Sequence, residues 1–134
     1  MLMDASGPHV LLKVAVIEDS PLVLRTMGVL LGELDRVQVV GDAADERAAI
    51  ELLHLRRPDL AILDLELKTG SGFGVLKAIS RNPEHFGRPR TVVFSHHNRI
   101  EVRQRCLALG AERFFDKATQ MGELLAYVRQ SVPS

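Results

Sequence analysis

Pro58-Asp59-Leu60-Ala61-Ile62-Leu63-Asp64 is the stretch of sequence that decides the fold. Four apolar residues, Leu60 to Leu63, follow Pro58 and Asp59, and the stretch ends in a carboxylate at Asp64. Such a run predicts a buried strand, although a buried helix segment could carry the same pattern. Strands of a parallel sheet are covered on both faces, so they are apolar throughout. The aspartate then either caps a turn or helix, or is a reactive group at the carboxyl edge, where open α/β sheets bind ligands.

The segments on either side repeat one order of strand and helix. We predict strands at residues 10–17, 37–40, 60–64, 91–95 and 113–116, each followed by a helix. The helices are expected to begin at Ser20, Asp45, Asn98 and Thr119 as caps, and near Gly72 for the third. Gly41 is expected to end the second strand, and residues 84–89 to form a surface loop. Five alternations predict a flavodoxin-like (βα)5 three-layer α/β sandwich, whose parallel five-stranded sheet has the order 2-1-3-4-5.

Composition narrows the class of protein. The chain has 134 residues, which suits one domain, and its 17 basic and 17 acidic side chains give zero formal charge. A neutral chain argues against direct nucleic-acid binding by bulk electrostatics. A single cysteine, Cys106, excludes an internal disulfide, and no apolar stretch predicts contact with a membrane. Residues 1–9 lack a signal-peptide pattern and are predicted to be a flexible leader before a single domain at 10–134, in the cytoplasm.

Polar side chains stand where four of the predicted strands end. They are Glu18 and Asp19 after the first strand, Asp64 after the third, Ser95 after the fourth and Lys117 after the fifth. Because parallel strands end at one edge of the sheet, these side chains are expected to lie close together. Neighbouring carboxylates repel one another and need a countercharge. A hard divalent cation and Lys117 are the natural ones.

This set of groups indicates phosphoryl chemistry. Aspartate is a known nucleophile toward phosphoryl groups, and such transfer depends on positioning and on neutralising the transferred oxygens. Mg²⁺ is held by one or two carboxylates together with a phosphate. We therefore expect Asp64 to accept a phosphoryl group, Asp19 and Glu18 to hold Mg²⁺, and Ser95 and Lys117 to bind the phosphate. The alternatives are a structural cap for Asp64 and a turn residue for Ser95.

These residues, in this order, resemble the receiver domain of response regulators in two-component signalling, over about residues 14–128. The acid pair, the phosphorylatable aspartate, the switch hydroxyl and the lysine correspond to Glu18-Asp19, Asp64, Ser95 and Lys117. Gly72 matches the family's glycine eight positions after the aspartate, and Phe114 its aromatic switch.

The resemblance implies further roles for nearby residues. Glu66 would offer its backbone carbonyl to Mg²⁺, and Glu66, His96 and His97 would tune the lifetime of the phosphate. Two of the family's common prolines are replaced, by Lys68 in the loop after Asp64 and by Ala118 after the lysine.

The resemblance also implies the partners. The donor would be a sensor histidine kinase or a histidine phosphotransfer protein. The output would be a protein-interaction surface on the fourth helix, fifth strand and last helix, binding a downstream protein or a second copy. The chain would be a signalling phosphoacceptor rather than an enzyme. Two alternatives stay open. One is a degenerate receiver that acts as a constitutive protein-interaction module, with its site blocked by His96. The other is an aspartyl-phosphate phosphatase with Glu66 as proton donor.

Overall fold

The computed structural model describes residues 10–133, so the leader predicted at residues 1–9 lies outside the described part of the chain. The strands are β2 (Leu12–Ile17), β3 (Val37–Ala43), β4 (Leu60–Leu63), β5 (Arg90–Ser95) and β6 (Arg113–Asp116). The helices are α1 (Pro21–Gly32), α2 (Glu46–Arg56), α3 (Gly72–Arg81), α4 (Ile100–Ala108) and α5 (Met121–Gln130), with a 3-10 turn η1 (Pro83–Phe86). All strand pairs are parallel, in the order β3-β2-β4-β5-β6. The predicted flavodoxin-like order 2-1-3-4-5 is confirmed.

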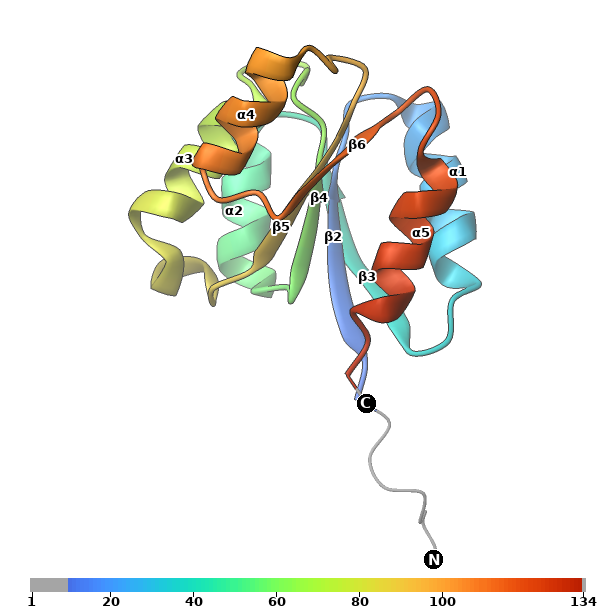
Figure 1. Cartoon of the computed structure of the whole chain (residues 1–134). Coiled ribbons are helices and arrows are strands. Elements are labelled where there is room, and N and C mark those ends of the chain that lie inside the picture. Colours follow the sequence, from blue (N-terminus) through green and yellow to red (C-terminus); the bar gives the residue numbers. More distant parts are fainter. Residues whose placement is uncertain (1–9, 134) are drawn as a thin grey trace, which may run out of the picture.

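Helices cover both faces of the sheet. Helices α1 and α5 lie on one face, and α2, α3 and α4 lie on the other (Figure 1). Each side has its own apolar core, and neighbouring residues of a strand enter opposite cores because strand side chains alternate. Phe114 joins the core under α2 to α4, whereas Phe115 joins the core under α1 and α5. Within residues 10–133, none of the helices has the length and apolar character needed to span a bilayer.

Two of the predicted helix caps are confirmed. Ser20 Oγ accepts the Val23 N–H at 3.3 Å, and Asp45 Oδ1 accepts the Ala48 N–H at 2.8 Å. Each bond satisfies one of the N–H groups that a helix start leaves without an internal partner.

The predicted caps Asn98 and Thr119 are wrong. Helix α4 begins after Arg99 and α5 after Gln120, and neither start has a side-chain cap. The Asn98 side chain donates instead to Asp116 at the end of β6, at 2.6 Å. The Thr119 N–H donates to the Asp116 carbonyl, so the turn after β6 is one residue longer than expected.

Two predicted boundaries are also corrected. Strand β3 continues through Gly41 to Ala43, because Val14 pairs with Val39 and the next pair skips Val40. This irregularity adds one residue to β3, as in a β-bulge, and lets the strand run on. Residues 84–89 are not wholly a loop: η1 carries Phe86, which is 3% exposed and packs into the core under α2 and α3.

Gly72 allows the loop after β4 to fold back against the end of that strand. A Cβ at this position would lie 2.3 Å from the Asp64 carbonyl oxygen and 2.9 Å from the Leu65 Cα. Both neighbours are backbone atoms, so they cannot rotate away as a flexible side chain could. The Gly72 N–H also donates to the Leu65 carbonyl at 3.0 Å. The position of Asp64 therefore depends on the missing side chain of Gly72.

We predict that Gly72→Ala lowers the free energy of unfolding by about 1–3 kcal/mol, because it overpacks a rigid contact. The matched control is Gly28→Ala on α1, where an added Cβ meets no atom within 4 Å. That change is predicted to raise stability by about 0.5–1 kcal/mol, since alanine is the better helix former. Urea denaturation measures both. A Gly72→Ala variant as stable as the parent would contradict the close approach.

Candidate functional site

A lysine and two carboxylates form a buried cluster at the carboxyl edge of the sheet. The Lys117 Nζ lies 2.5 Å from Glu18 Oε1 and 2.8 Å from Asp64 Oδ2. The Glu18 and Asp64 side chains are 2% and 6% exposed, and that of Lys117 is 9% exposed. Strands β2 and β4 are neighbours, so their ends bring Glu18 and Asp64 together. Lys117 follows β6 and reaches across the end of β5 to meet them.

Asp19 completes an acidic group that could hold a metal ion. One carboxylate oxygen from each of Glu18, Asp19 and Asp64 lies within 4.8 Å of the others. Two backbone N–H groups orient these acids: that of Ser20 donates to Glu18 Oε2 at 3.0 Å, and that of Glu66 to Asp64 Oδ1 at 3.3 Å. An all-oxygen donor set of this kind suits Mg²⁺, which prefers hard carboxylate ligands and retains water.

Burial and ion pairing set the charges in the cluster. Burial raises the pKa of the Glu18 carboxyl, although hydrogen bonds from Lys117 and Ser20 offset part of the effect. Burial alone would lower the pKa of the Lys117 ammonium, but its hydrogen bonds to Asp64 and Glu18 outweigh burial and raise it. Lys117 therefore remains a cation at neutral pH. One ammonium beside the three-carboxylate group leaves an excess of negative charge, which favours a divalent cation.

Ser95 is joined to the cluster through the backbone of Lys117, and Phe114 lies in the core under α2, α3 and α4. Ser95 is fully buried at the end of β5, where its Oγ accepts the His97 N–H at 3.2 Å. Its carbonyl accepts the Lys117 N–H at 3.0 Å, which joins the loops after β5 and β6. Phe114 is 8% exposed, and the Arg103 guanidinium lies 4.8 Å from the centre of its ring. Within residues 10–133, no hydrogen bond joins Ser95 to Asp64.

The rim of the site carries an ion pair between two loops. His97 Nε2 lies 3.1 Å from Glu66 Oε2, and both side chains are at least half exposed. The two residues come from the loops after β5 and β4, so the pair joins these two loops at the carboxyl edge of the sheet. His96 is exposed and lines, with Lys117, a separate hollow of about 230 Å³ beside α1.

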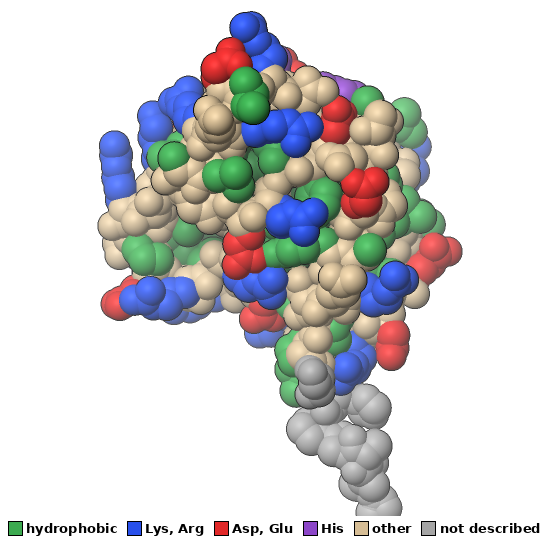
Figure 2. Space-filling model, viewed as in Figure 1, with side chains coloured by type: hydrophobic (Ala, Val, Ile, Leu, Met, Phe, Trp, Pro, Cys, Tyr) green, Lys and Arg blue, Asp and Glu red, His purple; other side chains and the backbone are tan. Residues whose placement is uncertain are grey.

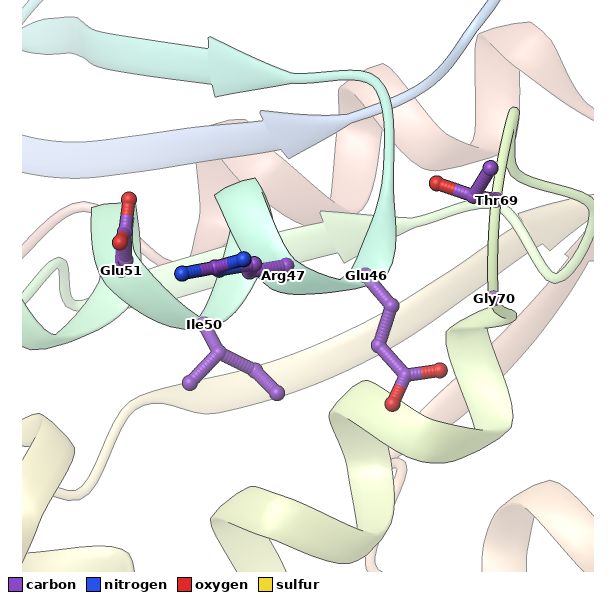
Figure 3. A pocket seen from close by; sticks show the side chains of 6 residues that line it. All are labelled: Glu46, Arg47, Ile50, Glu51, Thr69 and Gly70. Carbon is purple, nitrogen blue, oxygen red and sulfur yellow. The ribbon is translucent and has the colours of Figure 1, made fainter.

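Glu46 supports the loop after β4 and was not singled out from the sequence. Its Oε1 accepts the Ser71 N–H at 3.0 Å, and its carboxylate points toward the start of α3 (Figure 3). Glu46 and Gly70 also line a shallow hollow of about 470 Å³ that contains none of the predicted site residues. Gly74 leaves room for the same carboxylate, because a Cβ there would come within 2.4 Å of it. In the sequence, Gly70 and Gly74 were the available sign that a side chain such as Glu46 packs closely here.

Asp116 is a second residue that sequence reasoning missed. Its carboxylate accepts the Asn98 side-chain amide at 2.6 Å and the Ala118 N–H at 2.8 Å. Its own N–H donates to Gln120 Oε1 at 2.7 Å. The Asn98 hydrogen bond, followed by that of Ala118, holds the pKa of the Asp116 carboxyl below its ordinary value. Its place directly before Lys117 was the only clue in the sequence.

The family model of the response regulator receiver domain matches residues 14–129. The chain therefore belongs to the response regulator receiver domain family. The fimbriae Z protein of Salmonella typhimurium is 33% identical over 116 residues, which cover 87% of this chain and 54% of that protein. A protein-glutamate methylesterase/protein-glutamine glutaminase of Geobacter sulfurreducens is 30% identical over 122 residues, 90% of this chain and 32% of that protein. The chain thus spans about half the length, or less, of these relatives.

Solved structures agree in fold. The signal receiver domain of the response regulator NarL from Mycobacterium tuberculosis has a TM-score of 0.82 and 29% identity, covering 92% of this chain and 97% of that one. RcsB from Salmonella enterica serovar Typhimurium, solved on the promoter rprA with the phosphomimetic BeF3−, has a TM-score of 0.74 and 27% identity. That match covers 86% of this chain and 66% of RcsB.

The position of Lys117 yields a prediction about metal affinity. Its ammonium is bound to two of the three acids that could hold Mg²⁺, so it opposes a second cation there. We expect Lys117→Met to tighten Mg²⁺ binding, on the order of tenfold, since a like charge is removed from a buried site. Calorimetric titration measures the dissociation constant. Lys13→Met, which removes an exposed lysine of β2, is the control and should leave it unchanged. Weaker Mg²⁺ binding in Lys117→Met would contradict this account of the charges.

Proposed function

We propose that the chain is a phosphoacceptor receiver that takes a phosphoryl group on Asp64. The observation that carries the proposal is the Lys117 ammonium, bound at once to Glu18 and Asp64 beside Asp19, in a chain of the receiver family. The donor is the phosphohistidine of a sensor histidine kinase or phosphotransfer protein. An Asp64 carboxylate oxygen attacks phosphorus, the P–N bond breaks, and the imidazole nitrogen that leaves takes up a proton.

The side chains around Asp64 supply charge and orientation for this transfer. Lys117 exchanges part of its bond to the Asp64 carboxylate for a bond to a phosphoryl oxygen. Ser95 turns its hydroxyl from the His97 N–H toward the same group. Mg²⁺, held by Glu18, Asp19, Asp64 and the Glu66 carbonyl, would neutralise charge on the transferred oxygens. The two protein donors come from the ends of β5 and β6, which both lie on the same side of β4 in the sheet.

The output is a change in the surface of α4, β6 and α5. A shift of Ser95 frees space beside β6, and Phe114 repacks between two positions, which biases a two-state surface. Arg103 rests on the Phe114 ring, so its guanidinium would move with it. Basic side chains lie among hydrophobic ones over this face in Figure 2. The partner is a downstream protein or a second copy of the chain.

The proposal also covers the extent of the domain, its location and the activities it lacks. Residues 10–134 form a single receiver domain that acts in the cytoplasm, where phosphohistidine donors and Mg²⁺ are available. The chain does not turn over a substrate of its own and does not bind nucleic acid directly. Promoter binding by RcsB and the methylesterase activity named for longer relatives belong to those proteins.

The proposal predicts that Asp64 is the residue that takes up phosphate. After incubation with acetyl phosphate and Mg²⁺, intact mass spectrometry is expected to detect one added phosphate on the parent chain. The adduct should be absent without Mg²⁺ and absent in Asp64→Asn. Asp59→Asn, a change in an exposed aspartate of the same segment, should retain the adduct. An adduct on a folded Asp64→Asn variant would contradict the proposal, and a parent chain that neither binds Mg²⁺ nor takes up phosphate would favour the constitutive module.

The proposal also predicts what sets the lifetime of the phosphate. The Glu66–His97 pair joins the loops after β4 and β5, and the Glu66 N–H contacts Asp64, so we expect the pair to slow the approach of water to Asp64. His97→Ala should shorten the half-life of the phosphorylated chain several-fold, and Glu66→Ala together with His97→Ala should shorten it no further, because both changes break one pair. Decay of the adduct after removal of the donor measures this. His85→Ala, an exposed histidine of η1, is the control. Additive effects of the two changes would contradict a joint role.

A further inference from the structure

The loop that carries Lys117 is closed by a bond that a proline at position 118 could not make. Asp116 ends β6, and its Oδ1 accepts the Ala118 N–H at 2.8 Å. This is the local turn that an aspartate forms with the backbone two residues on. A proline at position 118 has no N–H and would abolish the bond. Asp116 and Ala118 therefore form a hydrogen-bonded turn with Lys117 at its centre.

The same carboxylate reaches the loop that follows Ser95. Its Oδ2 accepts the Asn98 side-chain amide at 2.6 Å, across 18 positions of the sequence. The backbone N–H of Lys117 donates to the Ser95 carbonyl at 3.0 Å, which is a second link between the same two loops. Asp116 is 9% exposed, so water competes little for these bonds. The segments that present the hydroxyl and the ammonium are thus joined twice, through the Asp116 side chain and through the Lys117 backbone.

We propose that Asp116 is a positioning residue for the phosphoryl site, an inference that rests on the function proposed above. Through the Ala118 N–H it holds the Lys117 backbone so that the ammonium reaches Glu18 and Asp64. Through Asn98 it sets the distance between the Ser95 loop and the Lys117 loop, which must bind one phosphoryl group together. Lysine has a long flexible stem, so a fixed backbone is what confines its ammonium to the site.

The alternative role for Asp116 is general support of the fold near the start of α5. The two roles differ in what a substitution affects. A general loss of structure would weaken Mg²⁺ binding and phosphorylation together. A positioning role affects only steps that need Lys117 and Ser95, because Glu18, Asp19 and Asp64 form the metal group without Asp116.

The experiment measures Mg²⁺ affinity by calorimetry and the rate of phosphorylation by acetyl phosphate, on the full chain. Asp116→Ala is expected to slow phosphorylation about tenfold to a hundredfold, as for a misplaced catalytic group. Its Mg²⁺ affinity should be equal to that of the parent or tighter. Asp116→Asn keeps an oxygen for the Ala118 N–H, and the Asn98 amide can rotate to meet it, so this conservative variant should recover most of the rate. Asp35→Ala, in the exposed turn after α1, is the control.

Each outcome decides the proposal. Asp116→Ala with the parent's rate, or with rate and Mg²⁺ affinity reduced alike, would overturn it. If Asp116→Ala is too unstable to assay, Asn98→Ala decides: a several-fold slower rate with unchanged Mg²⁺ affinity is expected, and the parent's rate would overturn the proposal. A parent chain that takes up no phosphate would instead refute the proposed function, so the two failures are distinguishable.

Discussion

The ammonium of Lys117, held between Glu18 and Asp64, is the interaction on which the site depends. Carboxylates that are almost fully buried are costly unless a cation or hydrogen bonds compensate them. Lys117 supplies the charge, and the N–H groups of Ser20 and Glu66 supply hydrogen bonds. One cation does not balance the three acids, so the site remains suited to a divalent ion and to a phosphoryl group that brings its own charge. In the proposed transfer, Lys117 can therefore exchange its bond to Asp64 for a bond to the incoming phosphoryl group.

The fold places these groups through strand order and through the loops beyond the strands. The parallel order brings the ends of β2 and β4 together, and β6 delivers Lys117 from two strands away. Each loop is then fixed by a contact of its own. Gly72 lets the loop after β4 approach the Asp64 backbone, and Glu46 holds Ser71 of the same loop. Asp116 joins the loops after β5 and β6. The geometry of the cluster thus depends on residues that do not belong to it.

The strands and helix starts that depend on a local sequence pattern could be predicted from the sequence. Apolar runs such as Leu60 to Leu63 identified the strands, and capping side chains such as Ser20 and Asp45 identified helix starts. The acids and the lysine were found because strand ends meet at one edge whatever the details of the loops. The failures concern partners far apart in sequence. Asn98 is a residue type that commonly caps helices. Its side-chain amide instead donates to the carboxylate of Asp116, which is distant in sequence and makes the stronger hydrogen bond. The extra residue at Val40 and the burial of Phe86 depend on packing against other elements, which one stretch of sequence does not encode.

The most direct test of this account is a crystal structure of the chain with Mg²⁺ and beryllofluoride. The account predicts beryllium on an Asp64 carboxylate oxygen and Mg²⁺ among Glu18, Asp19 and Asp64. It also predicts that Lys117 Nζ binds a fluoride, and that Ser95 Oγ has turned from the His97 N–H toward another fluoride. A structure with Asp64 unmodified at saturating beryllofluoride, or with Lys117 still bound only to Glu18 and the Asp64 carboxylate, would contradict it.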